Sequence, residues 1–300
     1  MTGADTAGPD IGGRLERLTG AAVRELRPAG SQFRWNYYQV VLADGRAVFA
    51  KVAAAGLGGV FDAEARGLRW LGEAGAVGVP EVLGWDDATL VVSQIPPGRA
   101  DAAAAERLGR DLARLHGAGA PRFGAPWPGF IASLFLPNDQ PTPASATSGP
   151  VTWPDWYRAC RVLPYLRLAV DAGTLSRADA RLVESAAARA ADVAGPDEPP
   201  SRIHGDLWSG NVLWSGGGGW LIDPAAHGGH RETDLAMLAL FGAPYLDRIL
   251  GAYAGQAPLA PGWRQRVPLH QLHPLLVHVV LFGAAYREGT LAAARAVLAI

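Results

Sequence analysis

The segment at residues 203–213, with the sequence Ile-His-Gly-Asp-Leu-Trp-Ser-Gly-Asn-Val-Leu, constrains the fold of this chain more than any other. A short apolar run leads into Asp206, and Asn211 follows after four intervening residues. A Ser-Gly-Gly-Gly-Gly turn at 215–219 and a second apolar run then end at Asp223. Because consecutive glycines favour a tight hairpin turn, the pattern predicts a strand, a loop and a hairpin that bring Asp223 beside Asp206.

This order of side chains is typical of phosphoryl transfer. In protein kinases an aspartate of the catalytic loop accepts the hydroxyl proton, an asparagine of the same loop holds metal, and a later aspartate holds Mg²⁺. By the same chemistry Asp206 is the candidate catalytic base, and Asn211 and Asp223 are candidate ligands of Mg²⁺. The alternative is that these are turn residues, for which Asp and Asn are common. That explanation suits either residue alone better than the ordered set.

Lys51 is the only lysine among 27 basic residues. Arginine replaces lysine freely where a charge is solvated, but less freely where a compact ammonium must fit a tight phosphate site. The Asp44-Gly45 turn signal predicts a hairpin whose second strand, at 47–52, carries Lys51. The position is similar to that of the strand lysine that contacts the α- and β-phosphates in protein kinases. The alternative is compositional drift that left one lysine by chance.

The whole pattern resembles the fructosamine (ketosamine) kinase family, within the wider group of aminoglycoside-phosphotransferase-like kinases. The wider group needs only His-Gly-Asp, the asparagine and the later aspartate. The Trp-Ser pair at 208–209, Gly-His-Arg-Glu at 229–232 and Asp-Leu-Ala-Met at 234–237 are similar to the fructosamine branch. The resemblance covers nearly the whole chain; it is tight over 203–242 and loose before Lys51.

The resemblance implies an α+β, two-lobed protein-kinase-like fold. A small β-rich lobe at residues 1–95 would contact the nucleotide, and a larger helical lobe at 96–300 would hold the catalytic loop, metal and acceptor. The sequence pattern itself predicts these strands: 32–42, 47–52 and 89–95. It also predicts these helices: 11–26, 62–75, 102–116, 153–168 with an interruption at Pro164, 175–193, 233–241 capped by Thr233 or Asp234, 245–253, 270–286 and 291–298.

The resemblance also implies the nucleotide contacts. Glu64 would pair with Lys51, although a solvated glutamate is also favoured in the first turn of a helix. Further ATP contacts would come from a phosphate-covering loop and a hinge: Gly30, Ser31, Ser93, Gln94 and Ile95. The phosphate loop lacks the Gly-x-Gly-x-x-Gly pattern of protein kinases.

Other polar and aromatic residues near the motif are candidates for the acceptor site or for support. The candidate acceptor contacts are Trp208, His227, His230 and Arg231. Trp208 suits stacking on a sugar and filling the core equally well, and Arg231 suits a phosphate or an internal carboxylate. His204 is expected to shape the loop as a packed, hydrogen-bonded histidine, and Asp234 to anchor the catalytic-loop backbone.

Composition excludes some classes of function. A formal net charge of -1 gives no argument for nucleic acid or a membrane surface. Residues 1–10 lack the pattern of a secretory signal, and the apolar stretch at 275–285 is too short to span a bilayer. Cys160 is the single cysteine, which fits a reducing cytoplasm. Without paired His or Cys spacing, zinc is not expected. The expected assembly is a monomer or homodimer.

The expected activity is phosphorylation of a sugar hydroxyl by ATP with Mg²⁺. The resemblance implies the 3-hydroxyl of a ketosamine, a sugar-amine adduct that is free or attached to protein amines. A polycationic aminoglycoside would need many carboxylates, and few follow Asp223, although acids between Asp139 and Glu198 remain available. The alternatives are a kinase of another small molecule, such as an aminoglycoside, and a regulatory nucleotide-binding pseudokinase. The intact set of Lys51, Asp206 and the two metal-ligand candidates argues against the pseudokinase.

Overall fold

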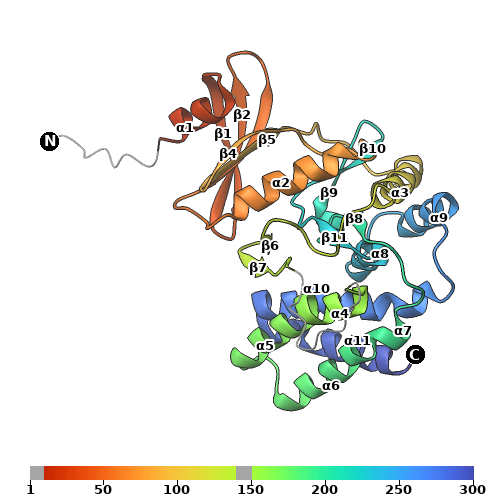
Figure 1. Ribbon diagram of the computed structural model, residues 1–300. Coiled ribbons are helices and arrows are strands. Elements are labelled where there is room, and N and C mark those ends of the chain that lie inside the picture. Colours follow the sequence, from red (N-terminus) through yellow and green to blue (C-terminus); the bar gives the residue numbers. More distant parts are fainter. Residues whose placement is uncertain (1–9, 140–150) are drawn as a thin grey trace.

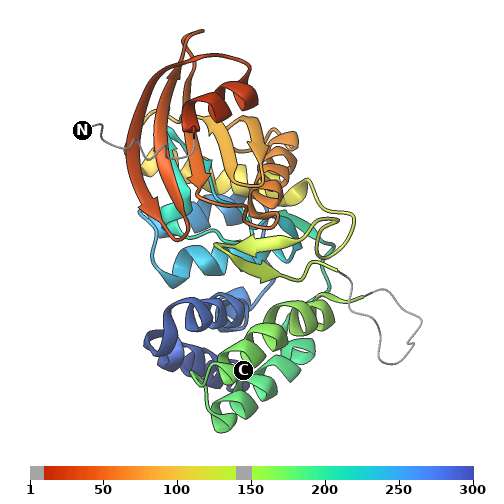
Figure 2. The ribbon, with the colours of Figure 1, turned by 90° about the vertical axis from the view of Figure 1, so that its left-hand side faces the viewer.

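The computed structural model describes residues 10–139 and 151–300. A β-sheet forms the N-terminal part and helices dominate the C-terminal part, so the fold is α+β (Figure 1). A view turned by 90° shows the sheet at one end of the molecule and the last helices at the other, with short strands between them (Figure 2).

The N-terminal sheet has five antiparallel strands in the order β1-β2-β3-β5-β4. Their bounds are β1 (Val23–Gln32), β2 (Trp35–Leu42), β3 (Ala47–Ala53), β4 (Val82–Asp86) and β5 (Thr89–Ser93). Helix α1 (Ile11–Thr19) and helix α2 (Val60–Glu73) pack into separate apolar clusters. Ala50 and Val52 of β3 join the α1 cluster, whereas Phe49 joins the α2 cluster. Since side chains alternate along a strand, Lys51 lies on the α2 face.

The expected helix at 11–26 is wrong beyond Thr19. Gly20 ends α1 in the left-handed conformation, with φ of 70°, and the chain continues as β1. Pro28 lies in β1 next to a shift of register. Prolines within sheets occur mainly on edge strands and at bulges, and β1 is the edge strand of this sheet.

The middle of the molecule carries the motif segment on two small sheets. Strand β8 (Ser201–Ile203) pairs with β11 (His227–Gly229), and β9 (Val212–Ser215) forms a hairpin with β10 (Gly218–Leu221). Leu207 and Leu221 pack in one apolar cluster with helices α3 (Ala102–Gly117), α8 (Arg231–Leu240) and α9 (Leu246–Gln256). The glycine-rich hairpin predicted around 215–219 is therefore present. Helix α8 begins before the expected residue 233, and its N-cap is His230, whose side chain accepts a hydrogen bond from Glu232 N.

The remaining helices form the far end of the molecule, beyond the short hairpin of β6 (Gly129–Ile131) and β7 (Leu134–Leu136). They are α4 (Trp153–Tyr157), η1 (Arg158–Val162), α5 (Leu163–Asp171), α6 (Arg177–Ala188), α7 (Ala190–Val193), α10 (Trp263–Phe282), η3 (Gly283–Tyr286) and α11 (Arg287–Leu298). The interruption expected at Pro164 lies earlier, in the π-helical turn η1. Proline is tolerated in the first turn of a helix, and Pro164 occupies that place in α5.

The segment Trp263–Leu298 is long and apolar enough to cross a membrane by length and composition alone. It consists of α10 and α11 with η3 between them, and half of its most apolar window is buried inside the fold. Leu272, Leu276 and Val279 of this segment belong to the largest apolar cluster. The core explains its apolar character.

The proposed lobe boundary at residue 95 falls between β5 and α3. Residues 94–101 belong to no helix or strand, and the sheet lies before them. The exact division of the chain into lobes at 1–95 and 96–300 stays a prediction.

Candidate active site

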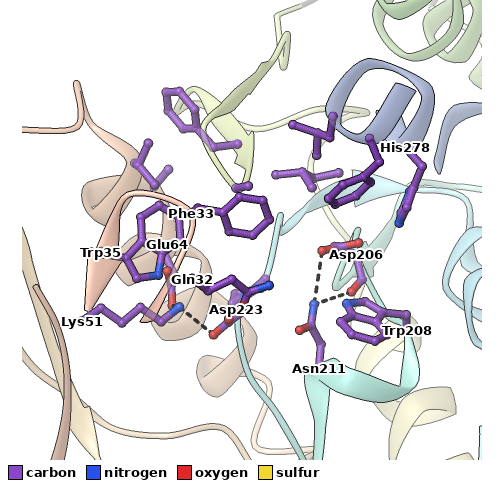
Figure 3. A pocket seen from close by; sticks show the side chains of 18 of the residues that line it. Gln32, Phe33, Trp35, Lys51, Glu64, Asp206, Trp208, Asn211, Asp223 and His278 are labelled. Atoms are coloured by element: carbon purple, nitrogen blue, oxygen red, sulfur yellow. Dashed lines mark hydrogen bonds and ion pairs between the residues drawn. The ribbon is translucent and has the colours of Figure 1, made fainter. Parts of the chain in front are cut away.

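A cavity of about 380 Å³ lies between the N-terminal sheet and the helical part. It is lined by β2 and β3, by α2, by the β1–β2 turn, by the motif loop and by the end of α10. Lys51, Glu64, Asp206, Asn211 and Asp223 all line it (Figure 3). Residues far apart in sequence thus meet here in the arrangement that the motif order predicts.

Lys51 holds two carboxylates from different elements. Its Nζ lies 2.7 Å from Oε1 of Glu64, on α2, and 2.7 Å from Oδ1 of Asp223, which follows β10. Burial alone would lower the pKa of Lys51, but the charges of Asp223 and Glu64 outweigh it and raise the pKa above its ordinary value. Lys51 is therefore an ammonium, and the expected ion pair with Glu64 is present.

Asn211 fastens the loop that carries Asp206. Its Nδ2 donates to the backbone oxygen of Asp206 at 2.8 Å and to Oδ2 of the same residue at 3.2 Å. Burial, together with the nearby charge of Asp223, raises the pKa of Asp206 to about 7. The loop thus fixes a carboxylate of unusually high basicity at the cavity surface.

Two oxygen atoms that could bind a metal ion are not used by the contacts described above. Nδ2 of Asn211 is used within the loop, which leaves its Oδ1, and Oδ1 of Asp223 is used by Lys51, which leaves its Oδ2. Oxygen ligands of this kind suit Mg²⁺. Asp223 also adopts φ of 53°, a conformation that non-glycine residues hold mainly where the surrounding structure enforces it. The donor set fits the expected Mg²⁺ site, although the metal-binding roles stay predictions.

Asp234 anchors the loop that carries Asp206 by accepting hydrogen bonds from its backbone. Its carboxylate accepts from the backbone nitrogens of His204 at 2.7 Å and Gly205 at 2.9 Å, and from Nε2 of His116 at 3.1 Å. His204 in turn donates from Nε2 to the backbone oxygen of Ile222 at 2.9 Å, which joins the loop to the segment before Asp223. These contacts agree with the supporting roles expected for His204 and Asp234.

His116 completes this buried network and was missed in the sequence. Its Nε2 donates to Asp234, and its Nδ1 lies 2.8 Å from the Tyr253 hydroxyl. Burial alone would raise the pKa of Asp234, but the hydrogen bond from His116 holds it below its ordinary value. His116 lies in the last turn of α3, and no neighbouring residue marks it, so the sequence carries no signal for this role.

Three residues expected near the acceptor do not line the cavity. His227 is buried against Trp156, and its Nδ1 donates to the backbone oxygen of Ala225 at 2.7 Å. Burial lowers the pKa of His227 to about 3. His230 is buried as the cap of α8, and Arg231 forms two hydrogen bonds, of 2.7 and 2.6 Å, with the carboxylate of Glu198. All three side chains therefore make contacts within the fold. Of the two partners considered for Arg231, a phosphate or an internal carboxylate, the structure shows the carboxylate of Glu198.

Buried His230, Glu232 and His270 also place possible metal ligands within 4.8 Å of one another. Both carboxylate oxygens of Glu232 accept from Arg266, at 3.0 and 2.6 Å. The guanidinium thus already supplies the positive charge that this carboxylate requires.

The expected phosphate loop and hinge lie beside the cavity rather than on it. Gly30 and Ser31 pair with β2 as part of β1, and Gln32 at the end of β1 and Phe33 in the turn line the cavity instead. The hinge residues Ser93, Gln94 and Ile95 are likewise absent from its lining. Oγ of Ser93 accepts from the backbone nitrogen of Glu81 at 2.9 Å. The ATP contacts assigned to these residues stay predictions.

Trp208 lines the cavity with 38% of its surface exposed, so it is no core residue. Its ring lies over Gly210, where an added Cβ would collide with it. Its edge meets Phe241, with ring centroids 6.3 Å apart. Because Gly210 has no side chain, the Trp208 ring can lie against the loop and line the cavity.

An aromatic wall completes the cavity, and the sequence analysis missed it. His278, Phe282 and Tyr286 line one side from the end of α10 and from η3. A spacing of four residues puts side chains on one face of a helix, so this repeat was a usable signal. Phe33 lines the cavity from the β1–β2 turn, and no local pattern marks it.

Comparison with known proteins gives a consistent result. The fructosamine kinase family model matches residues 28–299. A "probable ketoamine kinase" of Klebsiella aerogenes is 33% identical over 232 residues, covering 76% of this chain and 77% of that protein. A Thermobifida fusca structure assigned as a fructosamine-3-kinase has a TM-score of 0.91 and 51% identity, covering 97% and 99% of the two chains.

A more distant structural relative is the aminoglycoside phosphotransferase APH(4)-Ia, solved with ADP and hygromycin B. Its TM-score is 0.63 at 16% identity, with 95% of this chain and 98% of that chain covered. At this identity the likeness shows the kinase-like fold alone.

Proposed function

This chain belongs to the fructosamine kinase family, and on that premise we propose that it transfers the γ-phosphate of ATP to the 3-hydroxyl of a ketosamine. The protein is a small-molecule kinase of the kinase-like fold. The nucleotide, the hydroxyl position and the roles of single residues belong to the proposal. The observation that carries it is the meeting of Lys51, Asp206, Asn211 and Asp223 around one cavity.

The proposed mechanism gives each polar group one task. Asp206 accepts a hydrogen bond from the acceptor hydroxyl, orients it and takes its proton. Asn211 Oδ1 and Asp223 Oδ2 would hold Mg²⁺, which would supply charge neutralisation at the phosphates. Lys51, kept charged by Glu64, would supply a positive charge to the phosphate oxygens. Little covalent chemistry is required of the protein, because positioning and electrostatic stabilisation supply most of the rate in phosphoryl transfer.

A neutral sugar bearing one amine fits the cavity better than a polycation. The acidic residues that line it are Glu64, Asp206 and Asp223. Lys51 already pairs with Glu64 and Asp223, and Asp206 is assigned to the reacting hydroxyl. Each ammonium of a polycation loses water on binding and needs an opposite charge. This supports a ketosamine over an aminoglycoside as the acceptor.

The partner in this proposal is a sugar-amine adduct, free or attached to a protein amine. We place the reaction in a reducing cytoplasm, which suits the free and buried Cys160, and we expect a monomer or homodimer. A regulatory pseudokinase is the less economical alternative, because the residues for chemistry are all present and meet at one site.

The test compares a fructosyl-amine with a kanamycin-like aminoglycoside at the same Mg-ATP concentration. Phosphate transfer is measured for each acceptor, and NMR of the product identifies the phosphorylated hydroxyl. We expect a higher kcat/KM for the fructosyl-amine and a product carrying phosphate on the 3-hydroxyl. A preference for the aminoglycoside would overturn the acceptor while leaving the kinase chemistry in place.

A further inference from the structure

Charged side chains and a set of aromatic rings in contact with one another both line the cavity. Lys51 contacts Glu64 and Asp223, and Asp206 contacts Asn211. The rings that we call the aromatic end come from both parts of the molecule, and Phe282 contacts both Phe33 and Tyr286. Phe33 comes from the β1–β2 turn, and Phe282 and Tyr286 come from α10 and η3. An acceptor whose hydroxyl meets Asp206 would share the cavity with these rings.

The aromatic end is unusually exposed for apolar side chains. Among the described residues ten large hydrophobic side chains are exposed, and four of them line this cavity: Phe33, Trp208, Phe241 and Phe282. Phe33 and Phe282 are exposed by 50% and 51%. Clustered exposed apolar surface marks a binding site more often than scattered single residues do. A ligand that covers these rings would remove them from water.

Phe33 and Phe282 face each other across the two parts of the molecule. Their ring centroids lie 6.5 Å apart, and Phe33 also packs against Trp35 at 5.8 Å. Phe33 stands at the tip of the turn with φ of 54°, a conformation that is costly for a bulky side chain and far easier for glycine or asparagine. The turn alone does not call for an aromatic residue there. Figure 3 shows its ring between Trp35 and Asp206.

The aromatic end offers little to a charged group. The carboxylates in the cavity lining are those of Glu64, Asp206 and Asp223, and none belongs to the segments that carry these rings. His278 donates from Nδ1 to the backbone oxygen of Pro274 at 2.7 Å, and burial lowers its pKa. It therefore stays neutral and presents Nε2 as an acceptor for a sugar hydroxyl. A second ammonium placed among these rings would lose water without meeting an anion.

We propose that Phe33 and Phe282 form a subsite for the substituent on the ketosamine nitrogen, and that this subsite selects an aromatic or bulky apolar substituent over an ionic chain. The inference rests on the proposed function, because it takes the acceptor to be a ketosamine. It assigns two specificity-determining residues and the class of amine from which the preferred acceptor forms. A sugar that has reacted with an amine bearing an aromatic ring is the preferred acceptor, and a sugar whose amine carries a second charged group is a poor one.

The test uses three fructosyl-amines that differ only on the nitrogen. One carries a benzyl group, one an aminopentyl chain and one the carboxymethyl group of glycine. We measure kcat and KM for each with the wild type, Phe33→Ala and Phe282→Ala. Leu168→Ala is the matched control, because Leu168 is 43% exposed on α5 and lies outside the cavity lining. Circular dichroism checks that each variant is folded, and the KM for ATP checks that the turn still serves the nucleotide.

We expect the wild type to favour the benzyl compound by about tenfold in kcat/KM, the lower end of what one apolar contact contributes to discrimination. Phe282→Ala and Phe33→Ala should each raise the KM of the benzyl compound and remove most of this preference, with Leu168→Ala unchanged. Equal kcat/KM for the three compounds, or an equal loss for all three in the variants, would overturn the subsite and leave the ketosamine kinase intact. No turnover of any of them would overturn the proposed function and the subsite together.

Discussion

At the scale of single residues, Lys51 illustrates why one charge is not replaceable by another. A single atom, Nζ, lies 2.7 Å from carboxylate oxygens of two different elements. A guanidinium is planar and wider, so it cannot take both contacts from the same point. We predict that Lys51→Arg lowers kcat/KM by about 100-fold, the cost of a misplacement of roughly 1 Å in an active site. Steady-state kinetics measure this, with exposed Arg295→Lys as the control. Wild-type kcat/KM in Lys51→Arg would show that the lone lysine is an accident of composition.

A variant of Asp206 can separate the proposed proton transfer from nucleotide binding. Its carboxylate faces the cavity, while the loop is held by the backbone oxygen of Asp206 and by Asp234. Asp206→Asn keeps this backbone support but removes the base. We predict a loss of turnover of about 100-fold or more, with the affinity for Mg-ATP largely retained. Calorimetric titration and single-turnover kinetics measure the two effects. A comparable loss of nucleotide affinity would reject the assignment.

The sequence predicted those site residues whose order along the chain is itself the signal. Asp206, Asn211 and Asp223 lie close in sequence, and the hairpin between them is a local structure. The predicted acceptor contacts that lie outside the cavity lining owe their positions to distant partners. His227 is buried by Trp156, and Arg231 is taken by Glu198. Local sequence contains no information about such partners, because burial is decided by the packing of the whole chain.

At the scale of elements, the prediction of a helix at 11–26 failed because its apolar spacing continued into a strand. Leu15, Leu18, Val23 and Leu26 have roughly helical spacing, and only the first two belong to a helix. The left-handed Gly20 ends α1, and pairing with β2 turns the rest into an edge strand. Pairing with an adjacent strand outweighs a weak helical preference here. Long, strongly patterned helices such as α3 were predicted almost to their ends.

Helix α6 offers a test of how one side chain ties two elements. Asp179 completes a capping box with Ser176 and accepts two hydrogen bonds from Arg287 of α11, at 3.0 and 2.7 Å. The hydrogen bond from Arg287 lowers the pKa of Asp179 to about 2. We predict that Asp179→Asn lowers the free energy of unfolding at pH 7 by about 1–3 kcal/mol. Urea unfolding measures this.

The pH dependence of this difference has a fixed sign. A carboxyl group whose pKa is depressed by folding adds stability above its unfolded pKa, and that stability is lost as pH falls through the folded pKa. The gap between wild type and Asp179→Asn should therefore narrow as pH falls from about 4 towards 2. Asp192→Asn is the control, because Asp192 forms an exposed ion pair on α7, where such pairs contribute little. A gap that stays constant from pH 7 to pH 3 would contradict the role of the Asp179 charge.

At the scale of the whole molecule, the active site joins the two parts of the chain. Lys51 and Asp223 are 172 residues apart in sequence and meet through one hydrogen bond. The resemblance predicted the two-part α+β architecture. It did not predict the aromatic wall, which takes Phe33 from one part and Phe282 from the other. The wall depends on how two parts of the fold approach each other, and no segment of the sequence encodes that approach alone.

Binding of nucleotide and metal should stabilise the whole molecule, because their proposed ligands come from both parts. We predict that ATP with Mg²⁺, at about 100 times its dissociation constant, raises the free energy of unfolding by about 2.7 kcal/mol. For a chain of this size that corresponds to a rise in Tm of about 4 °C, which differential scanning fluorimetry detects. ATP with EDTA should give a much smaller shift, since Asn211 and Asp223 would then hold no ion between themselves and the phosphates. The Asn211→Ala variant should lose most of the Mg²⁺-dependent rise in Tm. An equal rise in Tm with and without Mg²⁺ would contradict the assignment of Asn211 and Asp223 as metal ligands.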